Sequence, residues 1–211
     1  MKRLFLTSSV NFVAHDIAKR INKKGLKLAF ILTPTEVEEG DLKWLEDDRN
    51  ALKQAGLELT DYTFTDKTAK EVEEFIKDFD GIYVSGGNTF WLLEKIQQSN
   101  AAQVIRDFIN SGKLYISTSA GSIIAGPDIY PTYRIDKAEK AKNLKGYKGL
   151  ELVDFVVFPH WGNPLPYFKD NYLNHRLEHA YNKDHKIILL TDNQYIIVED
   201  DWYKIVDVRN V

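Results

Sequence analysis

The chain has 211 residues, of which 44% are hydrophobic and 28% are charged, and this composition excludes disordered, collagen-like and low-complexity proteins. The net charge of -3 leaves no excess of cations to neutralise phosphates, so nucleic acid is not expected as a partner. Because the chain has no cysteine, disulfides, thiolate metal sites and a cysteine nucleophile are also excluded.

The first predicted element is a buried strand over residues 3–8, directly after a basic start. The apolar run there is too short and too interrupted by polar residues for a signal peptide. No apolar run in the sequence approaches the ~20 residues that a membrane-spanning helix needs. We therefore expect a cytoplasmic protein with no membrane partner.

Short apolar runs alternate with longer helical patterns along the rest of the chain. The predicted strands cover residues 3–8, 26–34, 58–64, 81–85, 114–118, 155–159, 186–191 and 195–199, and the predicted helices cover 11–23, 41–54, 69–79, 88–98 and 101–111. Continuous apolar runs are typical of strands that are covered on both faces. We predict a single domain over residues 1–211 with an α/β fold, an open, mostly parallel sheet flanked by helices, and a C-terminal antiparallel hairpin.

Ser119 stands between a predicted buried strand and a predicted helix, and the small residues Ala120 and Gly121 follow it. This is the layout of a nucleophile elbow, in which a sharp turn raises the serine hydroxyl above the sheet. Ser117 stands where the G-x-S-x-G pattern of such elbows has its first glycine. A serine-rich helix start without a catalytic role is the alternative.

A second turn between strand and helix contains Gly86 and Gly87, followed by Asn88 and Thr89 as possible helix caps. Backbone N–H groups in such a turn suit an oxyanion or a carboxylate. The glycine spacing matches neither a Walker loop nor a dinucleotide fingerprint. A tight turn that binds no ligand is the alternative.

A serine nucleophile needs a base, and His160 is the histidine that directly follows a predicted buried strand. The carboxyl ends of parallel strands meet at one edge of a sheet, which brings His160 towards Ser119. His175 and His179 are four residues apart on a predicted late helix, but the H-E-x-x-H pattern and a third ligand are missing. We read that pair as a surface helix face and expect neither a metal nor an organic cofactor.

Four motifs in this order resemble the peptidase E family of aspartyl-dipeptidase-like serine peptidases. The motifs are Gly86-Gly87-Asn88-Thr89-Phe90, Ser119-Ala120-Gly121, Phe158-Pro159-His160 and Leu190-Thr191-Asp192-Asn193-Gln194. The resemblance covers nearly the whole chain. The resemblance implies the fold of the class I glutamine amidotransferases, which is flavodoxin-like.

The resemblance also implies catalytic roles, with Ser119 as the nucleophile and His160 as the base. The acid of the family lies shortly after the nucleophile, where Asp136 is the best match. Asp128 is nearer to the serine but less well placed, and Asp192, after another predicted strand, is the alternative acid.

Further positions follow from the same resemblance. The backbone N–H groups of Gly87 and Ala120 match the oxyanion hole of the family. Candidate substrate-binding residues are Asn88, Thr89 and Arg134.

The expected function is serine-type hydrolysis of short peptides that have a free amino end. An N-terminal aspartate is the substrate residue that the resemblance implies, although Ser122 and Ile123 stand where aspartyl dipeptidases often carry Ala-Asn. The segment from Arg134 to Lys148 carries more cations than carboxylates, which favours an acidic substrate if this segment borders the site. A basic loop in solvent, pointing away from the site, is the alternative.

Two other functions remain open at this stage. One is a cyanophycinase-like peptidase or another amide hydrolase, and the other is a non-catalytic binding protein with the same fold. The expected partners are a short peptide substrate and a second copy of the chain in a homodimer.

Overall fold

The structure is a computed structural model that describes residues 1–132, 136–163 and 184–210. The strands are β1 (Arg3–Thr7), β2 (Lys27–Ile31), β3 (Glu58–Tyr62), β4 (Gly81–Val84), β5 (Leu114–Thr118), β6 (Phe155–Phe158), β7 (Lys186–Leu189), β8 (Gln194–Glu199) and β9 (Trp202–Asp207). The helices are α1 (Val10–Ile21), α2 (Lys43–Gln54), α3 (Ala69–Ile76), α4 (Thr89–Ser99), α5 (Ala101–Asn110) and α6 (Ala120–Ile124). Short 3-10 turns include η1 (Thr33–Thr35) and η3 (Ala138–Lys140).

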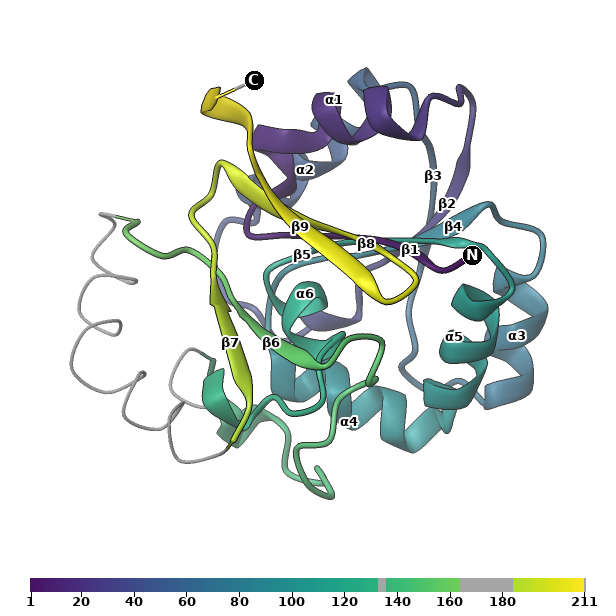
Figure 1. Cartoon of the computed structure of the whole chain (residues 1–211). Coiled ribbons are helices and arrows are strands. Elements are labelled where there is room, and N and C mark those ends of the chain that lie inside the picture. Colours follow the sequence, from purple (N-terminus) through teal and green to yellow (C-terminus); the bar gives the residue numbers. More distant parts are fainter. Residues whose placement is uncertain (133–135, 164–183, 211) are drawn as a thin grey trace.

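The centre of the molecule is a seven-stranded sheet with the order β3-β2-β4-β5-β1-β8-β9. Strands β3, β2, β4, β5 and β1 are parallel, whereas β8 runs antiparallel to β1 and forms a hairpin with β9 (Figure 1). This arrangement confirms the predicted open, mostly parallel sheet with a C-terminal antiparallel hairpin.

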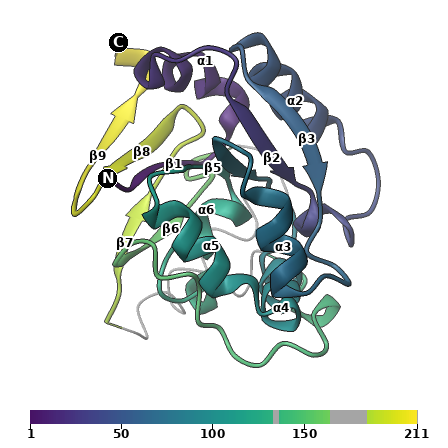
Figure 2. The ribbon, with the colours of Figure 1, turned by 90° about the vertical axis from the view of Figure 1, so that its right-hand side faces the viewer.

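Helices cover both faces of the central sheet. Helices α1 and α2 lie on one face, and α3, α4, α5 and α6 lie on the other (Figure 2). Successive residues of a strand point to opposite faces, so β1 directs Phe5 towards α1 and α2 and directs Leu4 and Leu6 towards the other layer. All three side chains are fully buried. Coverage on both faces explains why the inner strands β1, β2 and β4 are apolar runs, whereas the edge strand β3 is polar and largely exposed.

Strands β6 and β7 form a separate two-stranded parallel sheet, which the sequence pattern did not predict. In the central sheet, the edge of β1 that faces away from β5 pairs with β8 along its whole length. That edge is therefore closed to β6, which packs against α6 instead. The additional sheet brings the residues that follow β6 and β7 close to the end of β5.

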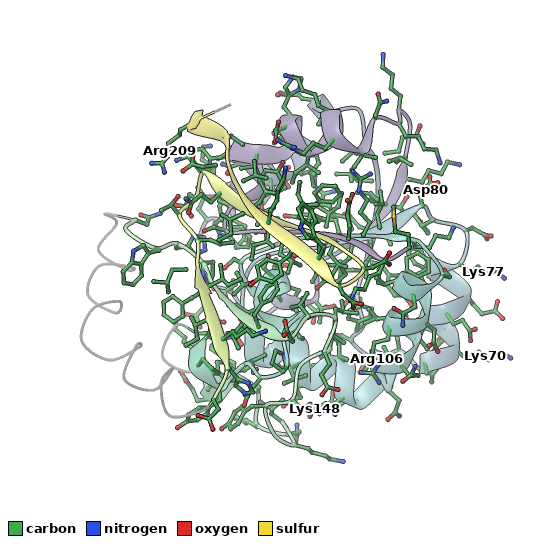
Figure 3. All side chains as sticks on the ribbon, viewed as in Figure 1. Lys70, Lys77, Asp80, Arg106, Lys148 and Arg209 are labelled. Carbon is green, nitrogen blue, oxygen red and sulfur yellow. The ribbon has the colours of Figure 1, made fainter. Side chains whose placement is uncertain are left out.

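The outer faces of the helices are charged. Lys70 on α3 and Lys77, which follows the last residue of α3, project away from the body of the molecule (Figure 3). Among the helices of the described ranges, none combines the length and the apolar character that crossing a membrane requires.

The parallel pairing of β5 with both β4 and β1 brings three strand ends together. Ser119 follows β5, Gly86 lies just after β4, and Ser8 follows β1. Ligands of open α/β sheets bind outside the carboxyl ends of such strands. The candidate site lies at this edge.

Candidate active site

Ser119 occupies the sharp turn between β5 and α6 in a strained backbone conformation. Its φ of 47° and ψ of -109° fall outside the regions that L-residues normally adopt. The Ser119 N–H donates to the Thr7 carbonyl over 3.1 Å, and the Ser119 carbonyl accepts from the Ser122 N–H over 2.8 Å. Neighbouring backbone therefore holds the turn in the geometry of a nucleophile elbow.

Gly121, two residues after Ser119, must be small because α6 packs closely on β4. A Cβ placed on Gly121 would lie 2.3 Å from the Val84 carbonyl oxygen, which no side chain can accommodate without movement. Beneath the turn, the buried hydroxyls of Ser117 and Ser122 lie 2.9 Å apart, and Ser122 donates to the Thr7 carbonyl. Ser117 thus fits in place of the glycine of the elbow pattern, and the turn keeps its strained conformation.

His160 lies two residues after the end of β6, beyond Pro159, and faces Ser119. Its Nε2 atom lies 2.9 Å from the Ser119 Oγ atom. The backbone N–H of His160 donates to the Ser8 Oγ atom over 2.6 Å, and this bond connects the end of β6 to the end of β1. The backbone of His160 has a φ of +60°, so both proposed reacting residues stand on tight turns at strand ends.

Asp192 lies on the other side of the His160 ring. Its Oδ1 atom is 2.7 Å from the Nδ1 atom of His160 and accepts a 2.7 Å hydrogen bond from the Ser8 hydroxyl. Its Oδ2 atom accepts from the Asn163 amide over 2.6 Å. Burial alone would raise the pKa of Asp192, but the hydrogen bond and charge of His160, together with Ser8 and Asn163, lower that pKa below its ordinary value. These contacts favour the ionised carboxylate.

Asp136, the expected acid, lies at a different place. Its Oδ2 atom accepts a 2.8 Å hydrogen bond from the Thr89 N–H at the start of α4. The two ring nitrogens of His160 face Ser119 and Asp192, so the carboxylate beside the imidazole is that of Asp192. The reason is topological: β7 pairs in parallel with β6, whereas the segment containing Asp136 packs beside α4.

Asn88 and Thr89 serve the start of α4 rather than the cleft. Asn88 caps the helix by accepting from the Trp91 N–H over 2.9 Å, and its amide donates to the Lys137 carbonyl over 3.1 Å. Both side chains are buried. The third predicted substrate-binding residue, Arg134, lies outside the described residues.

The glycine turn after β4 lies against Ser119. A Cβ placed on Gly86 would lie 3.4 Å from the Ser119 Cβ atom. Gly87 has a φ of +117°, and a Cβ there would lie 2.4 Å from the Pro34 carbonyl oxygen, so only glycine fits. Within the described residues, the N–H groups of Gly87 and Ala120 make no backbone hydrogen bond. Two such donors beside a serine are the parts of an oxyanion hole.

A cleft of about 440 Å³ opens over Ser119 and His160. Its walls include the aromatic side chains of Phe12 and Trp44, and among the described residues its ionisable groups besides His160 are carboxylates. Those carboxylates belong to Glu38, Asp48, Asp136 and Asp192.

In the part that the structure describes, the segment from Arg134 to Lys148 contributes Asp136 to this cleft and none of its lysines. Lys137 and Lys140 lie 3.7 and 2.7 Å from the Glu39 carboxylate, and Lys148 pairs with Glu151 over 2.8 Å. For these three lysines the structure agrees with the alternative of a basic loop outside the cleft. His175 and His179 lie outside the described residues.

Comparison with known proteins decides the family. A sequence profile of peptidase family S51 matches residues 4–206. Over 202 residues the chain is 34% identical to Lin0382, an uncharacterized peptidase of Listeria innocua, covering 95% of this chain and 94% of that protein. The chain belongs to peptidase family S51. The resemblance to the peptidase E family is thereby confirmed.

Other S51 relatives agree with this assignment. PM1590, an uncharacterized peptidase of Pasteurella multocida, is 37% identical over 166 residues, covering 77% of this chain and 79% of that protein. Peptidase E of Shewanella denitrificans is 36% identical over 95 residues, covering 45% of this chain and 39% of that protein.

Solved structures show the same fold. A crystal structure of a candidate peptidase E from Listeria monocytogenes superposes with a TM-score of 0.87 at 31% identity, covering 98% of each chain. A peptidase from an acI-B1 actinobacterium superposes with a TM-score of 0.72 at 16% identity, covering 98% of this chain and 88% of that one, which shows likeness of fold alone.

Three site residues of this S51 member were missed by sequence reasoning. Ser8 and Asn163 hold the Asp192 carboxylate, and Asp48 lies buried in the wall of the cleft. Ser8 ends a predicted strand, so the rule that sites gather at strand ends could have found it. The Asp48 carboxyl accepts from the Tyr83 hydroxyl over 2.9 Å, yet burial outweighs that contact and raises its pKa to about 7. Nothing in the sequence marked Asp48, since it lies within an ordinary helical pattern.

Proposed function

We propose that this chain is a serine-type peptidase that hydrolyses short peptides with a free amino end. The observation that carries the proposal is the hydrogen-bonded series from the Ser119 hydroxyl through the His160 ring to the Asp192 carboxylate, at the floor of the cleft. Asp192 replaces Asp136 as the proposed acid, because Asp192 is the carboxylate at Nδ1 of His160.

The proposed reaction begins with attack of the Ser119 Oγ atom on the scissile carbonyl. His160 Nε2 accepts the hydroxyl proton and then gives it to the leaving amine. Asp192 accepts a hydrogen bond from the Nδ1–H of the ring, which keeps the Nε2 lone pair directed at Ser119 and stabilises the imidazolium that forms. A water molecule, deprotonated by His160, then attacks the acyl group in the same way and releases it from Ser119.

The negative charge that develops on the carbonyl oxygen would be held by the N–H groups of Gly87 and Ala120. Each such donor contributes about 3 kcal/mol to transition-state stabilisation in comparable enzymes. The close contact of Gly87 with Pro34 supports this role, because it fixes the donor before substrate arrives.

A preference for an N-terminal aspartate, which the resemblance implies, has no support among the described residues. The cation expected to recognise that aspartate is Arg134, which lies outside them. We therefore leave aspartyl preference out of the proposed function.

Covalent labelling tests the proposed function directly. A fluorophosphonate at neutral pH is expected to add one phosphonyl group to the peptide that contains Ser119, as read by mass spectrometry. Ser119→Ala is expected to abolish labelling and lower turnover by several orders of magnitude, whereas Ser122→Ala, three residues away, should keep the labelling and cost much less turnover. A folded protein that is never labelled would instead be a non-catalytic binding protein.

A dipeptide library, read by the release of free amino acids, identifies the substrate. Hydrolysis of β-aspartyl-arginine polymer but not of dipeptides would reassign the chain to the cyanophycinase-like alternative. The carboxylate-lined cleft is the feature that keeps this alternative open, because the polymer carries arginine side chains.

A further inference from the structure

Two large aromatic side chains are exposed at the mouth of the cleft. Phe12, at the start of α1, is 56% exposed, and Trp44, at the start of α2, is 37% exposed. Both line the cleft that contains Ser119. We call this pair the aromatic rim. Exposed aromatic surface within a concave site is typical of a binding surface for apolar groups.

Trp44 lies close to the place where the scissile carbonyl must sit. A Cβ placed on Gly86 would lie 3.4 Å from the Cζ3 atom of Trp44 and 3.4 Å from the Ser119 Cβ atom. Gly86 precedes Gly87, the proposed oxyanion donor. The residue whose carbonyl enters this hole is the first residue of a dipeptide, so its side chain is the group within reach of Trp44.

The charge of the cleft opposes an acidic side chain at that position. Glu38 and Asp136 line the cleft, and no lysine or arginine of the described ranges does so. Asp48 lines it too, but with a pKa of about 7 it is only partly ionised at neutral pH. Partial burial and the charge of Asp136 raise the pKa of Glu38 and outweigh the opposing charges of Lys137 and Lys140. Such a field attracts the free ammonium group of a peptide and repels a side-chain carboxylate.

We propose that this cleft selects dipeptides whose first residue is apolar and disfavours an N-terminal aspartate, with Trp44 as the specificity-determining residue. The inference rests on the proposed peptidase function and adds the substrate class to it. Its source is the combination of an aromatic rim beside the oxyanion donor with carboxylates in the surrounding wall.

The test compares kcat/KM for Phe-Leu, Leu-Leu, Ala-Leu, Asn-Leu and Asp-Leu. Phe-Leu and Leu-Leu are expected to exceed Ala-Leu by about 10-fold or more, and Asp-Leu to fall below Asn-Leu. Raising the salt concentration from 0.01 to 0.15 M shortens the Debye length from ~30 to ~8 Å, so the gap between Asn-Leu and Asp-Leu should narrow.

Trp44→Ala is expected to lower kcat/KM for Phe-Leu by about 10-fold through KM, with Ala-Leu changing by less than about 3-fold. Trp44→Phe should retain most of the preference. Trp202→Ala is the matched control, because Trp202 is also exposed but lies on β9, outside the cleft. This variant should leave kcat/KM unchanged for both Phe-Leu and Ala-Leu. Phe12→Ala provides a second rim variant if Trp44→Ala fails to fold.

The outcomes separate the inference from the function on which it rests. Cleavage of Asp-Leu as fast as Phe-Leu, or a Phe-Leu preference that both rim variants retain, overturns the inference and leaves the serine mechanism intact. Phosphonate labelling of Ser119 without cleavage of any apolar dipeptide also overturns it. Absence of labelling in the folded wild type overturns the peptidase function, and the inference fails with it.

Discussion

The Asp192 carboxylate lies 2.7 Å from the Nδ1 atom of His160, and this contact joins residues that are 32 positions apart in the sequence. It exists because β6 and β7 pair in parallel, with Phe158 opposite Leu189, so the segments that follow the two strands leave the small sheet at the same edge. Asp136, the acid that the sequence motifs favoured, follows neither of these two strands.

This geometry predicts a clear difference between the two candidate acids. Asp192→Asn is expected to lower kcat by up to ~10⁴-fold, because an amide at this place favours the wrong tautomer of His160. Asp136→Asn keeps an oxygen that accepts from the Thr89 N–H, and it should lower kcat far less. Steady-state kinetics on the best library dipeptide measures both. A larger loss in Asp136→Asn would restore the sequence-based assignment, and two equally small losses would indicate a Ser119–His160 dyad.

Ser8 is expected to position His160 and Asp192 of the proposed triad without touching substrate. Its hydroxyl accepts from the His160 N–H and donates to Asp192, so Ser8→Ala should lower kcat by about 10- to 100-fold with little change in KM. Loss of this donor also raises the pKa of Asp192, which should move the acid limb of the pH–kcat profile to higher pH. Ser9→Ala is the control, because the Ser9 hydroxyl donates to Asn11 instead. An unshifted acid limb in Ser8→Ala would contradict the positioning role.

Gly87 should tolerate no side chain, for a reason beyond its backbone conformation. Gly87→Ala combines a positive φ with a Cβ that would lie 2.4 Å from the Pro34 oxygen, so a loss of about 2–4 kcal/mol in the free energy of unfolding is expected. Gly40→Ala has a comparable φ of +92° and no atom within 4 Å, and it should cost only about 1 kcal/mol. Urea unfolding measures both, and equal losses would show that steric contact with Pro34 is unimportant.

Asp48 should make the folded protein less stable as the pH rises. Burial raises its folded-state pKa from 3.8 to about 7, so between these values the folded state binds more protons than the unfolded chain. This contribution is complete below pH 4 and is lost as the pH rises through 7, with a total of about 2–4 kcal/mol. Urea unfolding between pH 5 and 8 should show this slope in wild type and in the exposed neighbour variant Asp47→Asn, but a flatter one in Asp48→Asn. The same slope in all three proteins would place the Asp48 pKa near its ordinary value.

Features that depend on a few consecutive residues could be predicted from the sequence. Continuous apolar runs identified the strands of the parallel sheet, and the small residues after Ser119 identified the elbow. These features depend on the alternation of side chains across a strand and on the space between neighbouring backbones, both of which are set by a few consecutive residues. His160 belongs to the same class, because its place at the end of a buried strand is visible in the chain itself.

The partner of His160 was decided only by the tertiary structure. Asp136 and Asp192 both follow plausible local signals, and the choice depends on which strand pairs with β6, a long-range contact that no local pattern specifies. The same is true of Ser8 and Asp48, whose roles arise when the end of β1 and the middle of α2 meet the cleft. The sequence by itself determined the sheet, the elbow and the histidine, because strand burial and turn sterics are local. Strand pairing and charge burial are properties of the assembled fold, so only the tertiary structure could place the carboxylates around Ser119 and His160.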